Sequence, residues 1–174
     1  MFDKPYTFTF VQKNKSRNGV KRHAYEYIYK FYIHKNHSCR KYIVEVKEYD
    51  RKLFTLDFYA KTPSDHLNQK YRLKTNQFSG GRLGATILTI LKNVFIEHGV
   101  IGYGMAGAAL PNENTNEFTK RFQIYVKILR RATKTNFEVF ENKKNSFIFI
   151  IHKEHVEDKE QIFSEYEQIL REIL

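Results

Sequence analysis

The sequence has few of the residues that mark exported, fibrous or membrane-spanning chains. It contains 1 Cys, 3 Pro and 8 Gly in 174 residues, which excludes an internal disulfide and a fibrous repeat. Its longest apolar run, residues 147–151, is far shorter than the roughly 20 residues that cross a bilayer. Residues 1–10 also lack the charged start and apolar core of an export signal. We therefore expect a soluble, cytoplasmic protein that does not contact a membrane.

The apolar content is ample for a folded core. Hydrophobic residues make up 41% of the chain and aromatic residues 16%, with 15 Phe and 12 Tyr. The length is that of one ordinary domain and too short for two independent cores of normal size. We predict a single α+β domain over residues 1–155, followed by an amphipathic C-terminal helix over residues 156–174.

The charge is strongly basic and unevenly distributed. Lys and Arg number 30 against 19 Asp and Glu, and 27 of these cations but only 12 of the acids fall within residues 1–150. A basic body with an acidic tail favours an anionic partner: a nucleic acid, a phosphorylated cofactor or an acidic protein. The densest basic cluster surrounds an Asn-Gly turn and is either a solvated loop or a phosphate contact. Its cations are Lys13, Lys15, Arg17, Lys21 and Arg22.

Alternating aromatic and β-branched residues dominate the first 75 positions, which predicts five strands joined largely as an antiparallel meander. The expected strands lie near residues 6–10, 25–33, 42–46, 54–58 and 71–73. One face of this sheet is strongly aromatic, and five tyrosines lie among the cations of this region: Tyr25, Tyr27, Tyr29, Tyr32 and Tyr42. Such a face is typical either of a buried core or of an exposed platform that stacks nucleic-acid bases between cations.

The pattern changes to helical spacing after residue 76. A flexible loop over residues 77–81 is expected to precede a helix from about Arg82 to Glu97, with Gly99 as its left-handed stop. A glycine-rich strand over residues 100–108 follows, where the glycines indicate close approach by backbone or a ligand. Asn114 and Glu117 resemble a capping box for a second helix that ends near Ala132. The chain then predicts a hairpin over residues 137–151 and the final helix.

Taken together, the expected order is five strands, helix, strand, helix, two strands, helix, with two helices packed on a mostly antiparallel, twisted sheet. From residue 41 to 152 this order resembles the GNAT (GCN5-related N-acetyltransferase) superfamily, and residues 1–40 supply strands where the family usually has one strand and two helices. The order is also similar to small uncharacterised bacterial domains that carry a run like residues 119–125.

The resemblance implies a site for acetyl-CoA or another acyl-CoA. In the family, the strand before the first of these helices splays from the next strand, the cofactor lies in the gap, and its pyrophosphate contacts amides at the helix start. The corresponding residues here are Ser79, Gly80, Gly81, Arg82, Leu83 and Gly84. Ser79 stands where the family has Gln or Arg, Arg82 replaces a glycine, and Gly84 matches the pattern.

The resemblance also implies a catalytic tyrosine. Tyr125, within residues 124–129, occupies the position of the family's general acid, which protonates the leaving thiolate. The alternative is a tyrosine that only packs against neighbouring aromatic residues.

Three functions stay open at this point. The first is an N-acyltransferase, and the second is a non-catalytic nucleic-acid-binding domain. The third is a catalytically silent, GNAT-like module that binds a protein partner or a second copy through its C-terminal helix. A metal site is not expected, because His34, His37 and Cys39 lack an evident fourth ligand.

Overall fold

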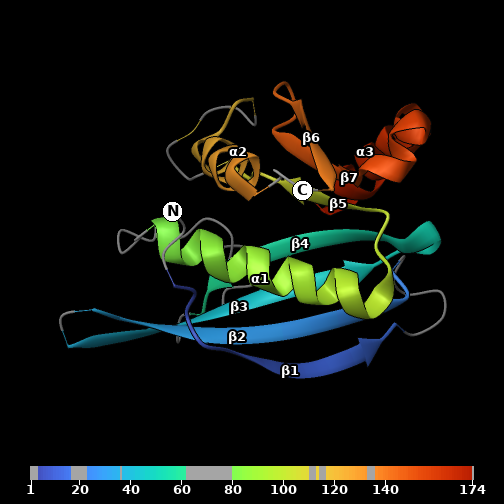
Figure 1. The fold of residues 1–174 in the computed structure, drawn as a ribbon. Helices are drawn as coiled ribbons and strands as arrows, with labels where there is room; N and C mark the ends of the chain where they lie inside the picture. Colours follow the sequence, from blue (N-terminus) through green and yellow to red (C-terminus); the bar gives the residue numbers. More distant parts are fainter. Residues whose placement is uncertain are drawn as a thin grey trace.

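The fold is described from a computed structural model of the chain. The structure describes residues 4–16, 23–35, 37–61, 80–109, 113, 117–132 and 136–173. Within them, seven strands form one sheet and three α-helices pack on it (Figure 1). The predicted α+β class and the mostly antiparallel sheet are therefore confirmed.

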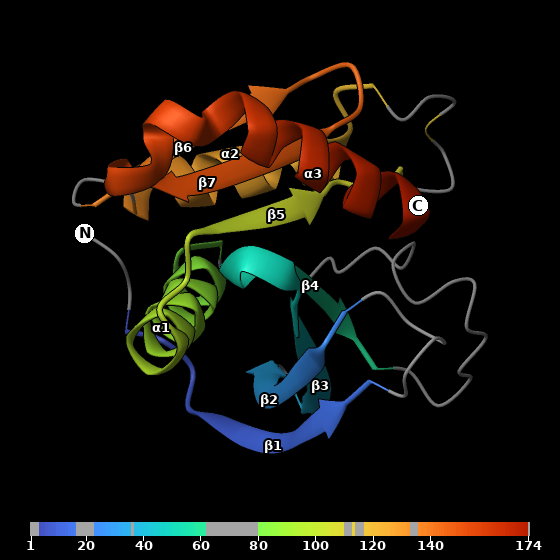
Figure 2. The same ribbon diagram turned by 90° about the vertical axis from the view of Figure 1, so that its right-hand side faces the viewer.

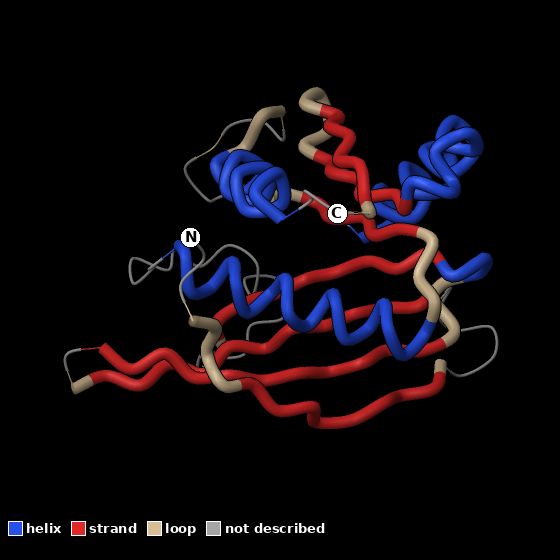
Figure 3. The backbone as a smooth tube through the Cα atoms, viewed as in Figure 1, coloured by secondary structure: helices blue, strands red, loops and turns tan. Residues whose placement is uncertain are grey.

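The elements follow the expected order except that the strand predicted near residues 71–73 lies outside the described residues. The strands are β1 (Phe8–Lys15), β2 (Tyr25–Lys35), β3 (Ser38–Glu48), β4 (Leu53–Ala60), β5 (Gly102–Ala106), β6 (Phe137–Asn142) and β7 (Phe147–His152). The helices are α1 (Gly80–His98), α2 (Lys120–Ala132) and α3 (Lys159–Ile173). Figure 3 shows how the strands gather into one twisted layer beside the helices.

The strand order across the sheet is β1-β2-β3-β4-β5-β7-β6. All neighbours pair antiparallel except β4 and β5, which run parallel and are joined in sequence by a connection that contains α1. Parallel strands run in the same direction, so the chain must return from the end of the first strand to the start of the second. A tight turn is too short for this return, and a longer crossover such as one with a helix is needed. The single parallel pair therefore divides the sheet into a β1–β4 half and a β5–β7 half.

Helices α1 and α2 cover the same face of the sheet. Every second residue of β2, from Tyr27 to Ile33, is buried on this face, as the period-two pattern predicts. These side chains join the apolar stripes of α1 and α2 in the larger of two core clusters, which includes Leu83, Ile90 and Phe122. The aromatic face of β2 is thus mainly a core face.

Helix α3 covers the opposite face of β5 and β7, as Figure 2 shows from the side. Its apolar residues Ile162, Tyr166, Ile169 and Leu170 are buried against Phe147, Phe149 and Ile151 of β7. A 3₁₀ segment, Lys153–Asp158, precedes α3, so the helix starts three residues later than Val156 alone would suggest. In the third of the open functions, the apolar stripe of this helix contacts a partner, but the protein's own sheet covers that stripe. The charged side of α3 is the side that faces away from the sheet.

Two helix ends differ from the sequence expectations and one agrees. Helix α1 begins at Gly80, so Gly80 and Gly81 belong to the helix and not to the predicted loop. Its end is confirmed, because Gly99 adopts the left-handed φ of 65°. Asn114 of the expected capping box lies outside the described residues, and the expected helix start after it is wrong, since α2 begins at Lys120.

The actual N-cap of α2 is Thr119, whose Oγ1 accepts a hydrogen bond from the backbone N–H of Phe122 at 3.2 Å. The same hydroxyl donates to the carbonyl oxygen of Gly107 at 2.6 Å and thereby fixes the helix start to the end of β5. None of the helices in the described ranges is long and apolar enough to cross a membrane.

Candidate cofactor site

The parallel pairing between β4 and β5 is short. It consists of three residue pairs, which start at Leu53↔Gly102 and end at Thr55↔Gly104. Strand β4 then continues to Ala60, still paired with β3, whereas β5 stays paired with β7 through Ala106. The two halves of the sheet therefore separate along the second part of β4.

In this second part of β4, the N–H and C=O groups of alternate residues point into the opening. The N–H of Tyr49 donates to the carbonyl of Leu53, and the N–H of Lys61 donates to that of Lys41, so odd-numbered β4 residues bond to β3. Because bonded and non-bonded pairs alternate in an antiparallel ladder, the N–H and C=O groups of Phe58 and Ala60 point away from β3. In the described part of the chain, no strand pairs with these groups.

The N-terminus of α1 lies at this open end. The C-terminal end of α1 leads through Gly99 directly into the start of β5, where β4 and β5 are paired. The helix runs back along β4, so its first turn lies near the strand ends that have separated (Figure 1). The first N–H groups of a helix have no partner within it, and the helix dipole makes this end favourable for an anion.

The six residues of the predicted phosphate loop have different environments. Gly80 and Gly81 form the first turn of α1, and Ser79 lies outside the described residues. Arg82 points back over the N-terminal segment: its guanidinium carbon lies 4.1 Å from the centroid of the Tyr6 ring, and its Nε donates to the carbonyl of Lys4 at 3.0 Å. These two contacts hold the cation of Arg82 against the N-terminal segment.

The two remaining loop residues serve packing. Leu83 is fully buried in the core. A side chain at Gly84 would meet Ile128 of α2 at 3.3 Å, so glycine at this position lets α1 and α2 approach closely. Of the predicted cofactor-binding residues within the described ranges, Gly80 and Gly81 contribute amides to the first turn of α1 and carry no side chain that is engaged elsewhere.

Tyr125 lies beside the opening but is almost completely covered. Its ring centroid is 5.2 Å from that of Phe58, on the separated part of β4, and 7% of its surface is exposed. Burial raises the pKa of Tyr125 to about 12, against the lowering effect of the nearby Arg121 guanidinium, which is hydrogen-bonded to it. The hydroxyl is therefore protonated at neutral pH, as a general acid must be. The ring is also packed in the core, as the alternative role of a packing residue requires.

The space beside the glycines in and just after β5 is filled by the protein itself. A side chain on Gly104 would come within 2.6 Å of the Tyr166 ring, and one on Gly107 within 2.6 Å of the Phe122 backbone nitrogen. The hydroxyl of Tyr166 also accepts a hydrogen bond from the N–H of Phe54 at 3.2 Å, at the point where β4 and β5 are still paired. Close approach by a chain segment, and not by a ligand, explains these glycines.

The basic cluster between β1 and β2 is only partly described. Arg17, Lys21 and Arg22 lie outside the described residues. Lys15 is exposed at the end of β1, and the Lys13 ammonium lies 3.9 Å from the centroid of the Tyr25 ring. This contact is a cation–π interaction within the chain.

The tyrosine platform predicted for nucleic-acid bases is not formed as a whole. Tyr27, Tyr29 and Tyr42 are buried in the core, so they cannot stack on bases. Tyr32 is 42% exposed and remains available to a ligand. The period-two pattern correctly grouped Tyr27 and Tyr29 on one face of β2. Whether that face is exposed or buried depends on α1, which packs on it.

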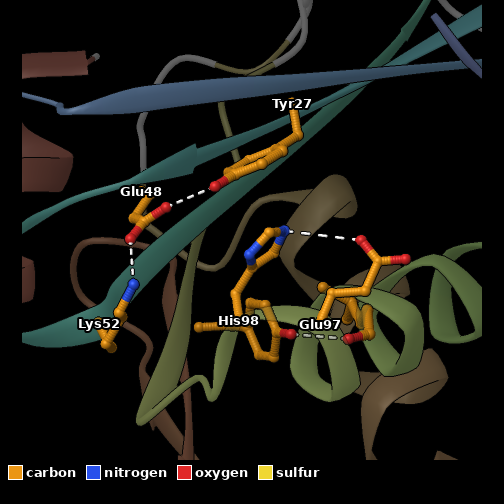
Figure 4. Close-up of polar contacts among 7 residues, drawn as sticks. Tyr27, Glu48, Lys52, Glu97 and His98 are labelled. Atoms are coloured by element: carbon orange, nitrogen blue, oxygen red, sulfur yellow. Dashed lines mark hydrogen bonds and ion pairs between the residues drawn. The ribbon is translucent and has the colours of Figure 1, made fainter. Parts of the chain in front are cut away.

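A polar cluster at the opposite end of α1 is absent from the sequence expectations (Figure 4). The hydroxyl of Tyr27 donates to Glu48 at 2.6 Å, Lys52 donates to the other oxygen of that carboxylate at 2.6 Å, and the His98 ring lies 4.5 Å from the Tyr27 ring. These residues come from β2, β3, the turn after β3 and the end of α1. No spacing within one segment could have revealed them.

Electrostatics fixes the protonation states in this cluster. Burial favours the neutral form of Glu48, but the hydrogen bonds from Lys52 and Tyr27 outweigh it and hold the carboxyl pKa below its usual value. Burial lowers the pKa of His98, although Glu48 and Glu97 act in the opposite direction. At neutral pH the cluster therefore holds an ionised Glu48 and a neutral His98, and it closes the end of the core under β2.

Metal ligation has little support in the described ranges. They contain no group of three or more His, Cys, Asp or Glu side chains placed to hold an ion. The Sγ atom of Cys39 lies 3.8 Å from Nε2 of His34 on the β2–β3 hairpin, which makes a pair and not a complete set of ligands.

Comparison with known proteins adds no family to this description. No family model matches the chain, and neither the curated proteins nor the solved structures give a significant match. The functional argument therefore depends on the geometry.

Proposed function

We propose that the chain is a divergent GNAT-like protein that binds an acyl-CoA between the separated parts of β4 and β5. The observation that carries this proposal is the parallel β4–β5 pairing, which stops after three residue pairs while β4 continues to Ala60. The first turn of α1 lies at the same open end. This combination is what the GNAT resemblance implies, and it is unusual in a sheet that is otherwise paired without a break.

The residues on the two sides of the opening fit the two ends of such a cofactor. The amides of Gly80 and Gly81 would hold a pyrophosphate, because unpaired N–H groups and the helix dipole favour negative charge there. The outward N–H and C=O groups of Phe58 and Ala60 would bond the amide-containing arm, as a free strand edge bonds an extended peptide. Both contacts use backbone groups, so a divergent sequence can keep them.

The reaction that this arrangement favours is acyl transfer to an amine. When bound, the thioester supplies an activated acyl group whose carbon–sulfur bond breaks as the carbon–nitrogen bond forms, with one proton passing from the amine to the thiolate. Tyr125 would donate that proton, because its hydroxyl is protonated at neutral pH and its ring packs on Phe58 in the separated part of β4.

Titration calorimetry with acetyl-CoA tests the proposal, with Gly81→Asp and Gly81→Ala as a matched pair. A carboxylate in the first turn of a helix stabilises the helix but repels a phosphate, so Gly81→Asp should keep the fold and weaken acetyl-CoA binding by about 10-fold or more. Gly81→Ala adds a methyl group without charge and should bind within about threefold of the wild type.

Two results would remove the acyl-CoA proposal. One is a wild-type protein that shows no binding heat with acetyl-CoA at high micromolar concentration. The other is a Gly81→Asp variant that binds as tightly as Gly81→Ala, because the first turn of α1 would then not contact the phosphates.

A further inference from the structure

The N-terminal segment, residues 4–7, is fastened to the beginning of α1 before the chain enters β1 (Figure 2). The backbone N–H of Tyr6 donates to Oγ1 of Thr86 at 2.8 Å, and the same hydroxyl donates to the carbonyl of Arg82 at 2.8 Å. Nε of Arg82 in turn donates to the carbonyl of Lys4 at 3.0 Å. The segment and the helix are therefore joined by hydrogen bonds that all involve Arg82 or the residue one turn after it.

These contacts fix the guanidinium of Arg82 and leave one of its edges free. Its central carbon lies 4.1 Å from the centroid of the Tyr6 ring, and that ring stacks on Phe31 at 5.8 Å between centroids. Nε is bonded to Lys4, whereas the two terminal nitrogens have no partner among the described residues, and the side chain is exposed. A guanidinium held in one plane with two free nitrogens is preorganised for the bidentate contact that a phosphate group makes.

The charge of Arg82 opposes the dipole of α1. The N-terminal end of a helix favours acidic side chains, but the first turn of α1 contains no acid and has Arg82 as its third residue. No acidic side chain in the described ranges forms an ion pair with this arginine. Fixing a cation at this end is unfavourable for the protein alone and becomes favourable once an anion is bound beside it.

Arg82 and the proposed acid lie on opposite sides of the first turn. Successive helix residues are about 100° apart, so Arg82 and Gly84 face roughly opposite directions. Gly84 faces Ile128 of α2, the helix that carries Tyr125. Arg82 instead faces Tyr6, whose ring packs on β2. The first-turn amides of α1 therefore lie between the acid and the fixed cation.

We propose that Arg82 binds the 3′-phosphate of the coenzyme and makes the site selective for 3′-phosphorylated acyl-CoA. This inference rests on the proposed acyl-CoA site. In CoA, the thioester is followed by the amide-containing arm, the pyrophosphate and the ribose that carries the 3′-phosphate. A cofactor with its thioester beside Tyr125 and its pyrophosphate on the first-turn amides directs the ribose to the Arg82 side of the turn. The terminal nitrogens of Arg82 bond the phosphate, and Tyr6 is a positioning residue that holds the guanidinium.

Titration calorimetry with acetyl-CoA and with 3′-dephospho-acetyl-CoA tests the proposal. A hydrogen-bonded contact between two charged groups at an exposed site contributes about 10-fold to affinity, so the wild type should prefer acetyl-CoA by about 10-fold. Arg82→Ala should bind the two cofactors within about twofold of each other. Its affinity for the dephospho form should stay within about threefold of the wild type, because that form lacks the phosphate that Arg82 contacts.

Two further variants separate positioning from packing and from diffuse charge. Tyr6→Leu removes the ring under the guanidinium and should lower the preference to about threefold, whereas a purely structural role would weaken binding of both cofactors equally. Lys92→Ala removes an exposed cation of α1 about 15 Å further along the helix and should keep the 10-fold preference. Thermal melts of the three variants check that the fold is intact.

Three outcomes would overturn the assignment of Arg82. The first is a wild-type protein that binds both cofactors equally, and the second is an Arg82→Ala variant that keeps the preference. The third is an equal loss of preference in Lys92→Ala, which would indicate a diffuse effect of net charge. All three leave the acyl-CoA proposal standing, because acetyl-CoA still binds. A wild-type protein that gives no binding heat with either cofactor would instead remove the acyl-CoA proposal, and this inference with it.

Discussion

Gly104 gives the sharpest test of how the two halves of the sheet are joined. A Cβ atom at this position would lie 2.6 and 2.8 Å from two ring carbons of Tyr166, closer than carbon atoms pack. The ring cannot simply withdraw, because its hydroxyl is bonded to the Phe54 N–H and its other face stacks on Phe149 at 5.5 Å between centroids. Gly104→Ala must therefore displace α3 or break the hydrogen bond.

The expected cost follows from these two terms. Overpacking a core costs about 1–3 kcal/mol, and a buried N–H that loses its partner costs about 1–3 kcal/mol more. A total of about 2–6 kcal/mol corresponds to a fall in melting temperature of roughly 4–24 °C for a chain of this size. Thermal unfolding followed by circular dichroism, together with urea titration, measures both quantities.

Gly99→Ala is the matched control. Gly99 also carries no side chain, but nothing lies within 4 Å of a Cβ built there, and the cost arises only from its φ of 65°. That conformation costs an alanine about 1–2 kcal/mol, so Gly99→Ala should be clearly less destabilised than Gly104→Ala. In a Tyr166→Leu background the clash is removed and Gly104→Ala should cost less than it does in the wild type. A Gly104→Ala variant that melts within about 2 °C of the wild type would refute the packing argument.

Three further predictions concern titratable groups. If Tyr125 is the acid, Tyr125→Phe should lower acyl-transfer turnover, measured as thiol release, by about 100-fold or more with acetyl-CoA affinity unchanged; equal turnover would leave it a packing residue. Burial raises the pKa values of Tyr29 and Tyr125 to about 12, so the folded protein holds protons that the unfolded chain has lost, and the urea midpoint should fall from pH 10 to pH 12. Burial lowers the pKa of His98 in the folded protein, so below about pH 6.5 the unfolded chain binds more protons than the folded protein does. The free energy of unfolding should therefore decrease from pH 7.5 to 5.5, and it should decrease less in His98→Gln.

Periodicity predicted the elements well because each depends on a repeat within one segment. Alternation placed β1 to β4 in the correct order, and the helical spacing from Leu83 to Val94 placed α1. The start of α2 could not be predicted in the same way. Asn114 and Glu117 offered a local cap, but Thr119 is the cap because its hydroxyl also bonds Gly107 across the fold. Both positions could start a helix locally, and the contact between Thr119 and Gly107 determines which of them does.

The candidate site was predictable only in outline. Predicting an anion site at the start of α1 needs nothing beyond glycines where a helix begins, and the sequence shows Gly80 and Gly81 there. That Arg82 turns toward Tyr6 and that Gly84 meets Ile128 depends on segments more than 40 residues away in the sequence. The cluster of Tyr27, Glu48 and His98 has the same origin, since its members share no helix or strand.

The two ends of the β1–β4 half differ in how their polar groups are satisfied, and the proposed acyl-CoA site lies at the end where fewer of them have partners in the described ranges. At the end where β3 passes into β4, the carboxylate of Glu48 has its partners in Tyr27 and Lys52, so the polar side chains are used within the fold. At the other end, β4 leaves β5 with the outward backbone groups of Phe58 and Ala60, which no strand in the described ranges pairs. A donor left without a partner costs stability unless a ligand meets it. The proposed acyl-CoA is anionic and reaches the molecule from that end.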